Sequence, residues 1–335
     1  MNKILTVIIP TYNMEKYLRK CLMSLVLKDP DIRNLLEVLV INDGSKDASS
    51  AIGKEFQSQY PECFRVIDKD NGNYGSCVNR GLSEATGKYV KILDADDYFD
   101  TTAFLKYLEK LQTLDVDIVL NHVNIVDEQG NITANWSYPI KELEVVNYWD
   151  YINDFGWLNM HMVAYKTENI RAIGYKQTEG ISYTDQEWIH LPITTVESAY
   201  SMPLKLYQYL VGREGQTMDG KVLSKKLGDT TKMLCSLGHT WQRYHGPEHK
   251  KKFLRDKFVN QTWRRYDEFA RFNLYDDNAF RIFDNQMLME FPMLRHEVDS
   301  ITIKKLGISF PIIKLWRNHL RPIFTIVCKI EKIIT

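Results

Sequence analysis

The chain has 335 residues, 44% of them hydrophobic and 26% charged, and its 43 basic side chains equal its 43 acidic ones. This composition is typical of a globular protein with enough apolar material for a core. A formal net charge of zero gives no overall basic surface, so we expect no nucleic-acid partner. Five scattered cysteines predict reduced thiols, and the lack of a run of about 18 apolar residues predicts no transmembrane helix. We therefore expect a cytoplasmic protein.

The first 127 residues alternate between strand-like and helix-like segments. Short runs rich in β-branched residues predict strands at 4–10, 36–43, 63–68, 88–93 and 117–127. Apolar residues at helical spacing predict helices between them, at 13–27, 47–60, 74–86 and 101–112. This alternation predicts an α/β fold in which a mixed, mostly parallel sheet is flanked by helices.

The pattern changes along the rest of the chain. Residues 128–220 read as a mixture of turns and further strands, whereas helical periodicity predominates from residue 221 onward. We therefore predict one domain at 1–220 and a second, mainly helical domain at 221–335.

Acidic residues gather where the fourth expected strand ends. "VKILDADDYFD" (90–100) places Asp94, Asp96 and Asp97 within four residues. Carboxylates so close raise one another's pKa, a cost that a solvated turn, a helix cap or a cation would offset. In an extended segment Asp94 and Asp96 point to the same side, and such oxygen ligands suit Mg²⁺ or Mn²⁺. Ligands bind at the carboxyl ends of parallel strands, so this edge is a candidate site.

Four segments together resemble a known family. They are "VIIPTYN" (7–13), "VINDGSKDAS" (40–49), "NRGLSEATGKYVKILDADDYF" (79–99) and "TDQEW" (184–188). In this order and spacing they resemble the inverting nucleotide-sugar glycosyltransferases of family 2, which have the GT-A fold. The resemblance covers roughly residues 4–215, and the C-terminal third carries no motif of that family.

The resemblance implies a donor site with a divalent cation, Mn²⁺ or Mg²⁺. Asp96 would be its ligand, and Asp94 would help to hold it or contact the nucleotide. Tyr12 would offer an aromatic face to the base, and Asp43 would accept an N–H group of uracil or thymine, although "NDGS" is also a tight turn. The residues that the resemblance assigns to the nucleotide are Pro10, Thr11, Tyr12, Asn13, Asp43, Asn73, Asn79, Asp94 and Ala95.

The resemblance also implies a general base. Asp185 aligns with the aspartate that deprotonates the acceptor hydroxyl, with Glu187 as the alternative; Asp185 would also serve as a helix cap. This chain departs from the family at Thr184, where glutamate is usual, and at Val78, where many members carry arginine.

Two further segments allow either a functional or an ordinary structural role. In "YLVGREGQTMD" (209–219), Arg213, Gln216 and Thr217 would close over the diphosphate, or form an exposed loop. His161 would line the sugar pocket, or simply pack between its methionine neighbours.

The function implied is a metal-dependent inverting transfer of a sugar from a nucleoside-diphosphate donor, UDP-linked by preference. The acceptor would be a hydroxyl of a growing cell-surface or capsular glycan, free or lipid-linked. The alternative is an inactive GT-A-like protein that binds nucleotide sugars or acts as a scaffold. The basic, apolar tail at 308–334 is compatible with peripheral contact at the inner face of the plasma membrane, with a packed helix, or with a homo-oligomer contact.

Overall fold

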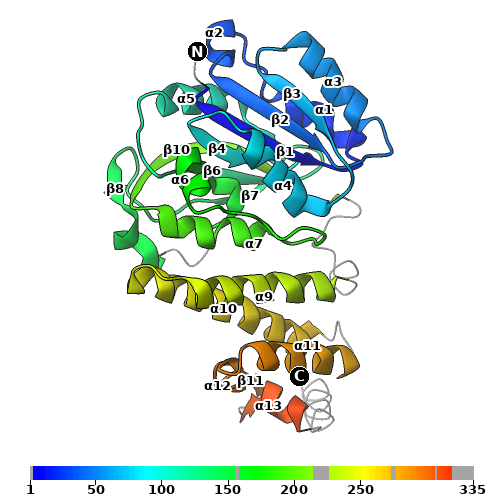
Figure 1. The fold of residues 1–335 in the computed structure, drawn as a ribbon, viewed down its shortest axis with the longest axis vertical. Helices are drawn as coiled ribbons and strands as arrows, with labels where there is room; N and C mark the ends of the chain where they lie inside the picture. Colours follow the sequence, from blue (N-terminus) through cyan, green and yellow to red (C-terminus); the bar gives the residue numbers. More distant parts are fainter. Residues whose placement is uncertain (1–2, 155–157, 214–225, 273–276, 306–307, 319–335) are drawn as a thin grey trace. The chain divides into compact units, whose positions relative to one another are not determined.

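The computed structural model describes residues 3–154, 158–213, 226–272, 277–305 and 308–318. The chain divides into two compact units, residues 1–216 and 217–335, which are described separately (Figure 1). The division after residue 216 and the predicted boundary after residue 220 both lie in the undescribed segment 214–225.

The N-terminal unit is built on one ten-stranded sheet with the strand order β3-β2-β1-β4-β9-β6-β10-β5, while β7 pairs with β6 and β8 with β10. Its strands are β1 (Leu5–Thr11), β2 (Leu36–Asn42), β3 (Phe64–Asp68), β4 (Tyr89–Ile92), β5 (Tyr98–Phe99), β6 (Ile118–Val126), β7 (Ile132–Trp136), β8 (Val145–Asn147), β9 (Val163–Lys166) and β10 (Ser198–Leu210). The five strands predicted before residue 128 are confirmed, and each end lies within one residue of the predicted end.

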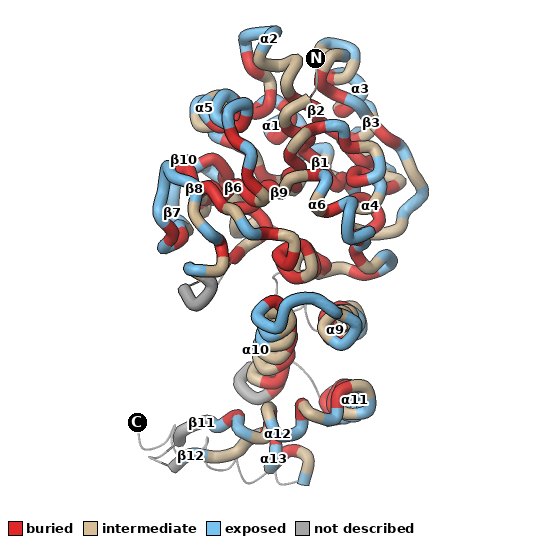
Figure 2. The backbone as a smooth tube through the Cα atoms, turned by 60° about the vertical axis from the view of Figure 1, so that its left-hand side comes forward, coloured by how far each residue is buried: buried red, intermediate tan, exposed pale blue. Residues whose placement is uncertain are grey.

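The sheet is mixed, as predicted. β3, β2, β1 and β4 run parallel to one another, and β6 runs parallel to β10. Antiparallel β9 joins the two groups because it pairs with β4 on one side and β6 on the other. β1 and β2 are buried along their whole lengths, so they form the centre of the core (Figure 2).

Helices cover this sheet as the α/β pattern requires. They are α1 (Glu15–Met23), α2 (Pro30–Arg33), α3 (Ser49–Gln59), α4 (Asn73–Glu84), α5 (Thr101–Leu111), α6 (Thr167–Ala172) and α7 (Asp185–Trp188), with short 3-10 helices η1 (Tyr148–Asp154), η2 (Met160–Met162) and η3 (Leu191–Thr195). α4 packs on β1 and β2, and α5 on β10. α4 approaches β1 so closely that a Cβ atom at Gly81 would lie 2.5 Å from Ile8 Cγ2.

The C-terminal unit is mainly helical, as predicted. It contains α9 (Leu227–Arg243), α10 (Glu248–Phe272), α11 (Asp277–Glu290), α12 (Leu294–Asp299) and α13 (Ile312–Arg317), together with a hairpin of β11 (Thr302–Lys305) and β12 (Ile308–Pro311) that the sequence analysis did not predict. Its core is aromatic: the rings of Phe280 and Trp316 stack at 4.4 Å.

The described part of the tail is packed within this unit. Ile313 and Trp316 are buried, and the Arg317 guanidinium bonds to the buried Asp284 carboxylate at 2.6 Å. These contacts favour the packed-helix interpretation for 308–318, whereas residues 319–334 of the predicted membrane segment lie outside the described residues. Among the helices that the structure describes, none is long and apolar enough to span a bilayer.

Candidate active site

The acidic turn at residues 94–97 follows β4 and is held by hydrogen bonds from β10. The Asp97 amide donates to the Asp94 carbonyl at 3.0 Å, which closes the turn. Asp97 is buried, and its two carboxylate oxygens accept hydrogen bonds of 2.7 Å from the Tyr207 hydroxyl and the Leu210 amide. Burial, and then the carboxylates of Asp96 and Asp94, raise the pKa of Asp97 well above its ordinary value. Asp97 therefore anchors the turn.

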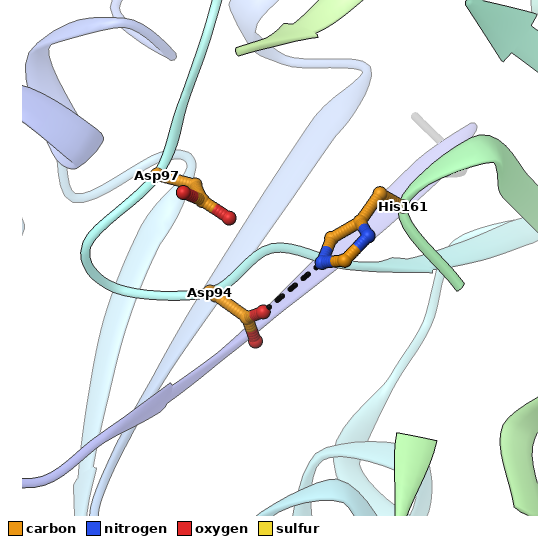
Figure 3. A group of neighbouring side chains, drawn as sticks. All are labelled: Asp94, Asp97 and His161. Carbon is orange, nitrogen blue, oxygen red and sulfur yellow. Dashed lines mark hydrogen bonds and ion pairs between the residues drawn. The ribbon is translucent and has the colours of Figure 1, made fainter. Parts of the chain in front are cut away.

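Asp94 lies beside a histidine from a different part of the chain. The His161 Nε2 atom lies 3.3 Å from Asp94 Oδ2 (Figure 3). The Tyr74 hydroxyl donates to Asp94 Oδ1 at 2.7 Å. The ligand atoms of Asp94, Asp97 and His161 all lie within 4.8 Å of one another.

This group fits a divalent cation. Two carboxylates supply the hard oxygen ligands that Mg²⁺ and Mn²⁺ prefer, and a nitrogen ligand beside them favours Mn²⁺ of the two. The other ring nitrogen of His161, Nδ1, is buried and has no hydrogen-bond partner among the described residues. The ring can therefore present Nε2 as an acceptor while Nδ1 carries the proton.

Asp96, predicted as the principal ligand, is not in that group. Its Oδ2 atom lies 2.5 Å from the Nε atom of Arg213. The guanidinium group of Arg213 also lies over the Tyr17 ring. Burial and the Asp94 charge raise the pKa of Asp96, while Arg213 lowers it. The structure thus joins Arg213 of the predicted diphosphate loop to the acidic turn, while Gln216 and Thr217 lie outside the described residues.

Asp185 is the first residue of α7, and its half-buried carboxylate accepts a hydrogen bond from Gln186 Nε2 at 2.8 Å. Burial raises its pKa; Gln186 and His161 oppose the increase, and the Asp94 carboxylate adds to it. Asp185 therefore lies within electrostatic reach of the acidic turn and His161. Glu187 is committed elsewhere because its two oxygens accept from the Thr178 amide and hydroxyl at 2.7 and 2.6 Å.

A second polar cluster follows β2. Asp43 is buried, and its Oδ1 atom accepts from Lys69 Nζ at 2.5 Å and from the Gly72 amide at 3.0 Å. Lys69 Nζ also donates to Ser76 Oγ at 2.8 Å. Because one oxygen of Asp43 is held in this way, the orientation of the whole carboxylate is fixed.

The Lys69–Asp43 pair leads to a prediction about stability. Replacing Lys69 by methionine leaves a buried carboxylate without its cation, so we expect the free energy of unfolding to fall by about 3 kcal/mol. Urea denaturation measures this loss. The exposed Lys46→Met variant serves as the control and should change stability by less than about 0.5 kcal/mol. Equal stabilities of the two variants would contradict the assignment.

The other residues predicted to bind the nucleotide lie around these clusters. Tyr12 is 47% exposed, as a stacking surface requires, whereas Pro10, Thr11 and Ala95 are buried. Asn13 and Asn73 both have positive φ angles, of 53° and 65°. The Asn79 amide is engaged with Gln177 and Glu179, so it connects α4 to the segment before Asp185. The nucleotide-binding role of each residue stays a prediction.

Three residues of the site were not found from the sequence. Tyr74 and Tyr207 donate to Asp94 and Asp97, and Lys69 neutralises Asp43. No motif marks Tyr74 or Lys69. Tyr207 and Tyr209 are two residues apart in β10, a spacing that places both rings on the same face of the sheet. This spacing is the one sequence signal that could have pointed to Tyr207.

Comparison with known proteins agrees with this geometry. Residues 6–164 match the sequence model described as glycosyl transferase family 2. The fold resembles the crystal structure of residues 1–349 of TarS from S. aureus in complex with UDP-GlcNAc, with a TM-score of 0.64 over 95% of this chain and 88% of that chain. At 18% identity this likeness shows the fold alone. Residues 6–164 are therefore similar to glycosyl transferase family 2, and the fold is of the GT-A type.

Curated relatives share part of this domain. Glycosyltransferase GlyA of Streptococcus pneumoniae serotype 4 is 35% identical over 150 residues, which are 45% of this chain and 19% of GlyA. Glycosyltransferase GlyG of the same organism is 31% identical over 43% of this chain and 48% of its own length. An uncharacterized glycosyltransferase of Mycoplasma pneumoniae, the MG025 homolog, is 43% identical over 30% of this chain and 33% of its own. The matches span less than half of each relative.

Proposed function

We propose that this protein is a metal-dependent inverting glycosyltransferase that uses a nucleoside-diphosphate sugar, UDP-linked by preference. The observation that carries the proposal is the pair of Asp94 and His161 beyond the carboxyl end of β4, together with the electrostatic influence of both on the Asp185 carboxylate. A single displacement requires a general base and a stabilised leaving group, and this arrangement supports both roles.

In the proposed reaction, Asp185 takes the proton from the acceptor hydroxyl. The acceptor oxygen then forms a bond to the anomeric carbon while the bond from that carbon to the diphosphate breaks, which inverts the configuration. Asp94 and His161, with Asp96 or Asp97, would hold a divalent cation, which would supply positive charge to the leaving diphosphate. Asp43 accepts an N–H group of the base, and Tyr12 offers its exposed ring for stacking.

The acceptor belongs to the same proposal. We infer a hydroxyl of a growing cell-surface or capsular glycan, free or lipid-linked, and a protein that stays in the cytoplasm or attaches to the inner membrane face. The names of GlyA and GlyG support transfer of a sugar but not a particular acceptor. A homo-oligomer stays a prediction.

The test is a thermal-shift panel of UDP, GDP, dTDP and CMP, each with Mn²⁺ and with EDTA. A ligand that binds only the folded protein raises the free energy of unfolding, by about 2.7 kcal/mol at a concentration of 100 times its Kd, and the midpoint temperature rises with it. We expect a Mn²⁺-dependent shift with UDP. No shift with any nucleotide would oppose the proposal, and a shift without any transfer to acceptors would favour the inactive binding protein, to which Val78 and Thr184 point.

The Asp185 environment predicts the pH dependence of transfer. The base acts as the carboxylate, and burial raises its pKa, so kcat/KM should fall as the pH decreases through a value above about 3.9, the ordinary value for aspartate. Initial rates at saturating Mn²⁺, with circular dichroism to verify folding at each pH, measure this midpoint. A midpoint at or below the ordinary value would contradict Asp185, whose pKa is raised, as the base.

A further inference from the structure

Lys91 is a buried lysine beneath the candidate site that no step above uses. It lies in β4, opposite Val7 of β1, and its side chain is completely buried. Burial lowers its pKa well below the ordinary value. Among the described residues its ammonium group meets three uncharged oxygens and no carboxylate: Asn121 Oδ1 and the His161 carbonyl at 2.8 Å, and the Val163 carbonyl at 3.3 Å.

An apolar side chain would be the less costly choice at this position. A lysine amino group moved from water into a core loses hydration that neutral oxygens only partly replace. The remaining residues of β4 are Tyr89, Val90 and Ile92, all buried and suited to a central strand. Burial of Lys91 does not stabilise the protein, so we attribute the role of this residue to its hydrogen bonds.

Those hydrogen bonds converge on the segment that carries His161. This segment is the three-residue helix η2, too short to be stable by itself. Lys91 holds the His161 carbonyl from below, and the Asn121 amide contacts the same carbonyl at 3.4 Å and the His122 carbonyl at 2.8 Å. The Asn159 side chain accepts from the His161 amide at 3.1 Å. Both backbone groups of His161 are thus fixed.

β4 also leads directly into the acidic turn. Lys91 precedes Asp94 by three residues, so one short strand carries both the anchor of His161 and the carboxylate that the ring contacts. Lys91 thus connects the two segments whose side chains meet at His161 Nε2 and Asp94 Oδ2.

We propose that Lys91 is a positioning residue that, together with Asn121, holds His161 against Asp94 and so shapes the cation site. This inference rests on the proposed function for its metal-binding consequence, but its geometric part is independent of any metal. It implies that the removal of the Lys91 donors weakens Mn²⁺ binding through His161 alone.

The principal variant is Lys91→Met, which keeps the length of the side chain, removes its donors and suits a buried position. Mn²⁺ binding in the presence of UDP is measured from the EPR signal of free Mn²⁺. We expect affinity to fall by about 10- to 100-fold, the usual effect of losing a group that orients a metal ligand. Lys106→Met, an exposed lysine of α5, is the matched control and should bind as the wild type does.

A double-mutant cycle tests whether Lys91 acts through His161. His161→Ala should weaken Mn²⁺ binding, and Lys91→Met should cause little further loss in that background. Independent, multiplicative losses would overturn the inference, and so would wild-type affinity in Lys91→Met. If Lys91→Met does not fold, Asn121→Leu replaces it with the same expected outcomes, because it removes the Lys91–Asn121 hydrogen bond and the Asn121 contact with the His161 carbonyl.

A second readout separates this inference from the proposed function. In protein labelled with ¹⁵N-histidine and free of metal, the ring signals of His161 are identified by their loss in His161→Ala. We expect them to move in Lys91→Met and to stay unchanged in Lys106→Met. If the wild type binds no Mn²⁺ with UDP, the proposed function fails, while these signals still decide the inference: unmoved signals in Lys91→Met would overturn it.

Discussion

Replacing Asp185 by asparagine is expected to lower the rate of sugar transfer by about 10³-fold, within the range that general-base catalysis contributes. Asparagine has nearly the same shape but cannot accept the proton of the acceptor hydroxyl. The side chain lies at the start of α7, where Gln186 and the backbone hold it, so the fold should survive. The measurement is kcat for transfer at saturating donor and Mn²⁺.

The assignment of the base requires that binding be retained. Asp185→Asn should bind UDP with Mn²⁺ as tightly as the wild type, because the residue acts on the acceptor and not on the nucleotide. Glu187→Gln offers a contrast: it disturbs the two hydrogen bonds to Thr178, so it should reduce stability more than kcat. Turnover at the wild-type rate in Asp185→Asn would show that another group is the base.

Replacing Asp96 by asparagine should remove most of the Mn²⁺-dependent part of donor binding. One negative charge is lost from the acidic turn, and Arg213 loses its ionic partner at 2.5 Å. We expect UDP affinity in Mn²⁺ to fall by about 100-fold, equivalent to about 2.7 kcal/mol. Isothermal titration calorimetry of UDP, with Mn²⁺ and with EDTA, measures the difference.

A matched control lies four residues away. Asp100→Asn makes the same chemical change at the N-cap of α5, where asparagine is an equally good cap. It should leave UDP affinity unchanged. In EDTA, the wild type and Asp96→Asn should bind UDP alike. An Asp96→Asn protein with undiminished affinity in Mn²⁺ would exclude Asp96 from the cation site and leave Asp94, Asp97 and His161 as its members.

The sequence allowed the prediction of whatever depends on local pattern. The alternation of strand and helix patterns predicted the α/β sheet, and the three aspartates after the fourth strand predicted an acidic site. Both features can be recognised because each depends on a short continuous stretch of sequence. The antiparallel β9 was covered only by the expectation of further strands within 128–220, since its pairing partners β4 and β6 are remote in the sequence. Pairing between distant segments has no local signature.

The roles within the acidic turn could be predicted only in part, for the same reason. Spacing and the family resemblance assigned Asp96 and Asp94 to the cation, but the sequence does not show which side chains surround each carboxylate. Most of these neighbours are remote in the sequence: His161 for Asp94, and Tyr207 and Leu210 for Asp97. Tyr74, the other partner of Asp94, is 20 positions away. Long-range packing thus distinguishes Asp97, which anchors the turn, from Asp94, which contacts His161.

The long strand β10 has a consequence for how this protein can be divided. The family match ends at residue 164, yet β10 pairs with β6 along nine residues and supplies the Tyr207 and Leu210 contacts to Asp97. A fragment cut at the end of the match would leave one whole edge of β6 unpaired, and such edges promote aggregation between copies. The end of the family match is therefore not the end of the folding unit. A fragment that is expressed by itself needs the chain at least through Leu210.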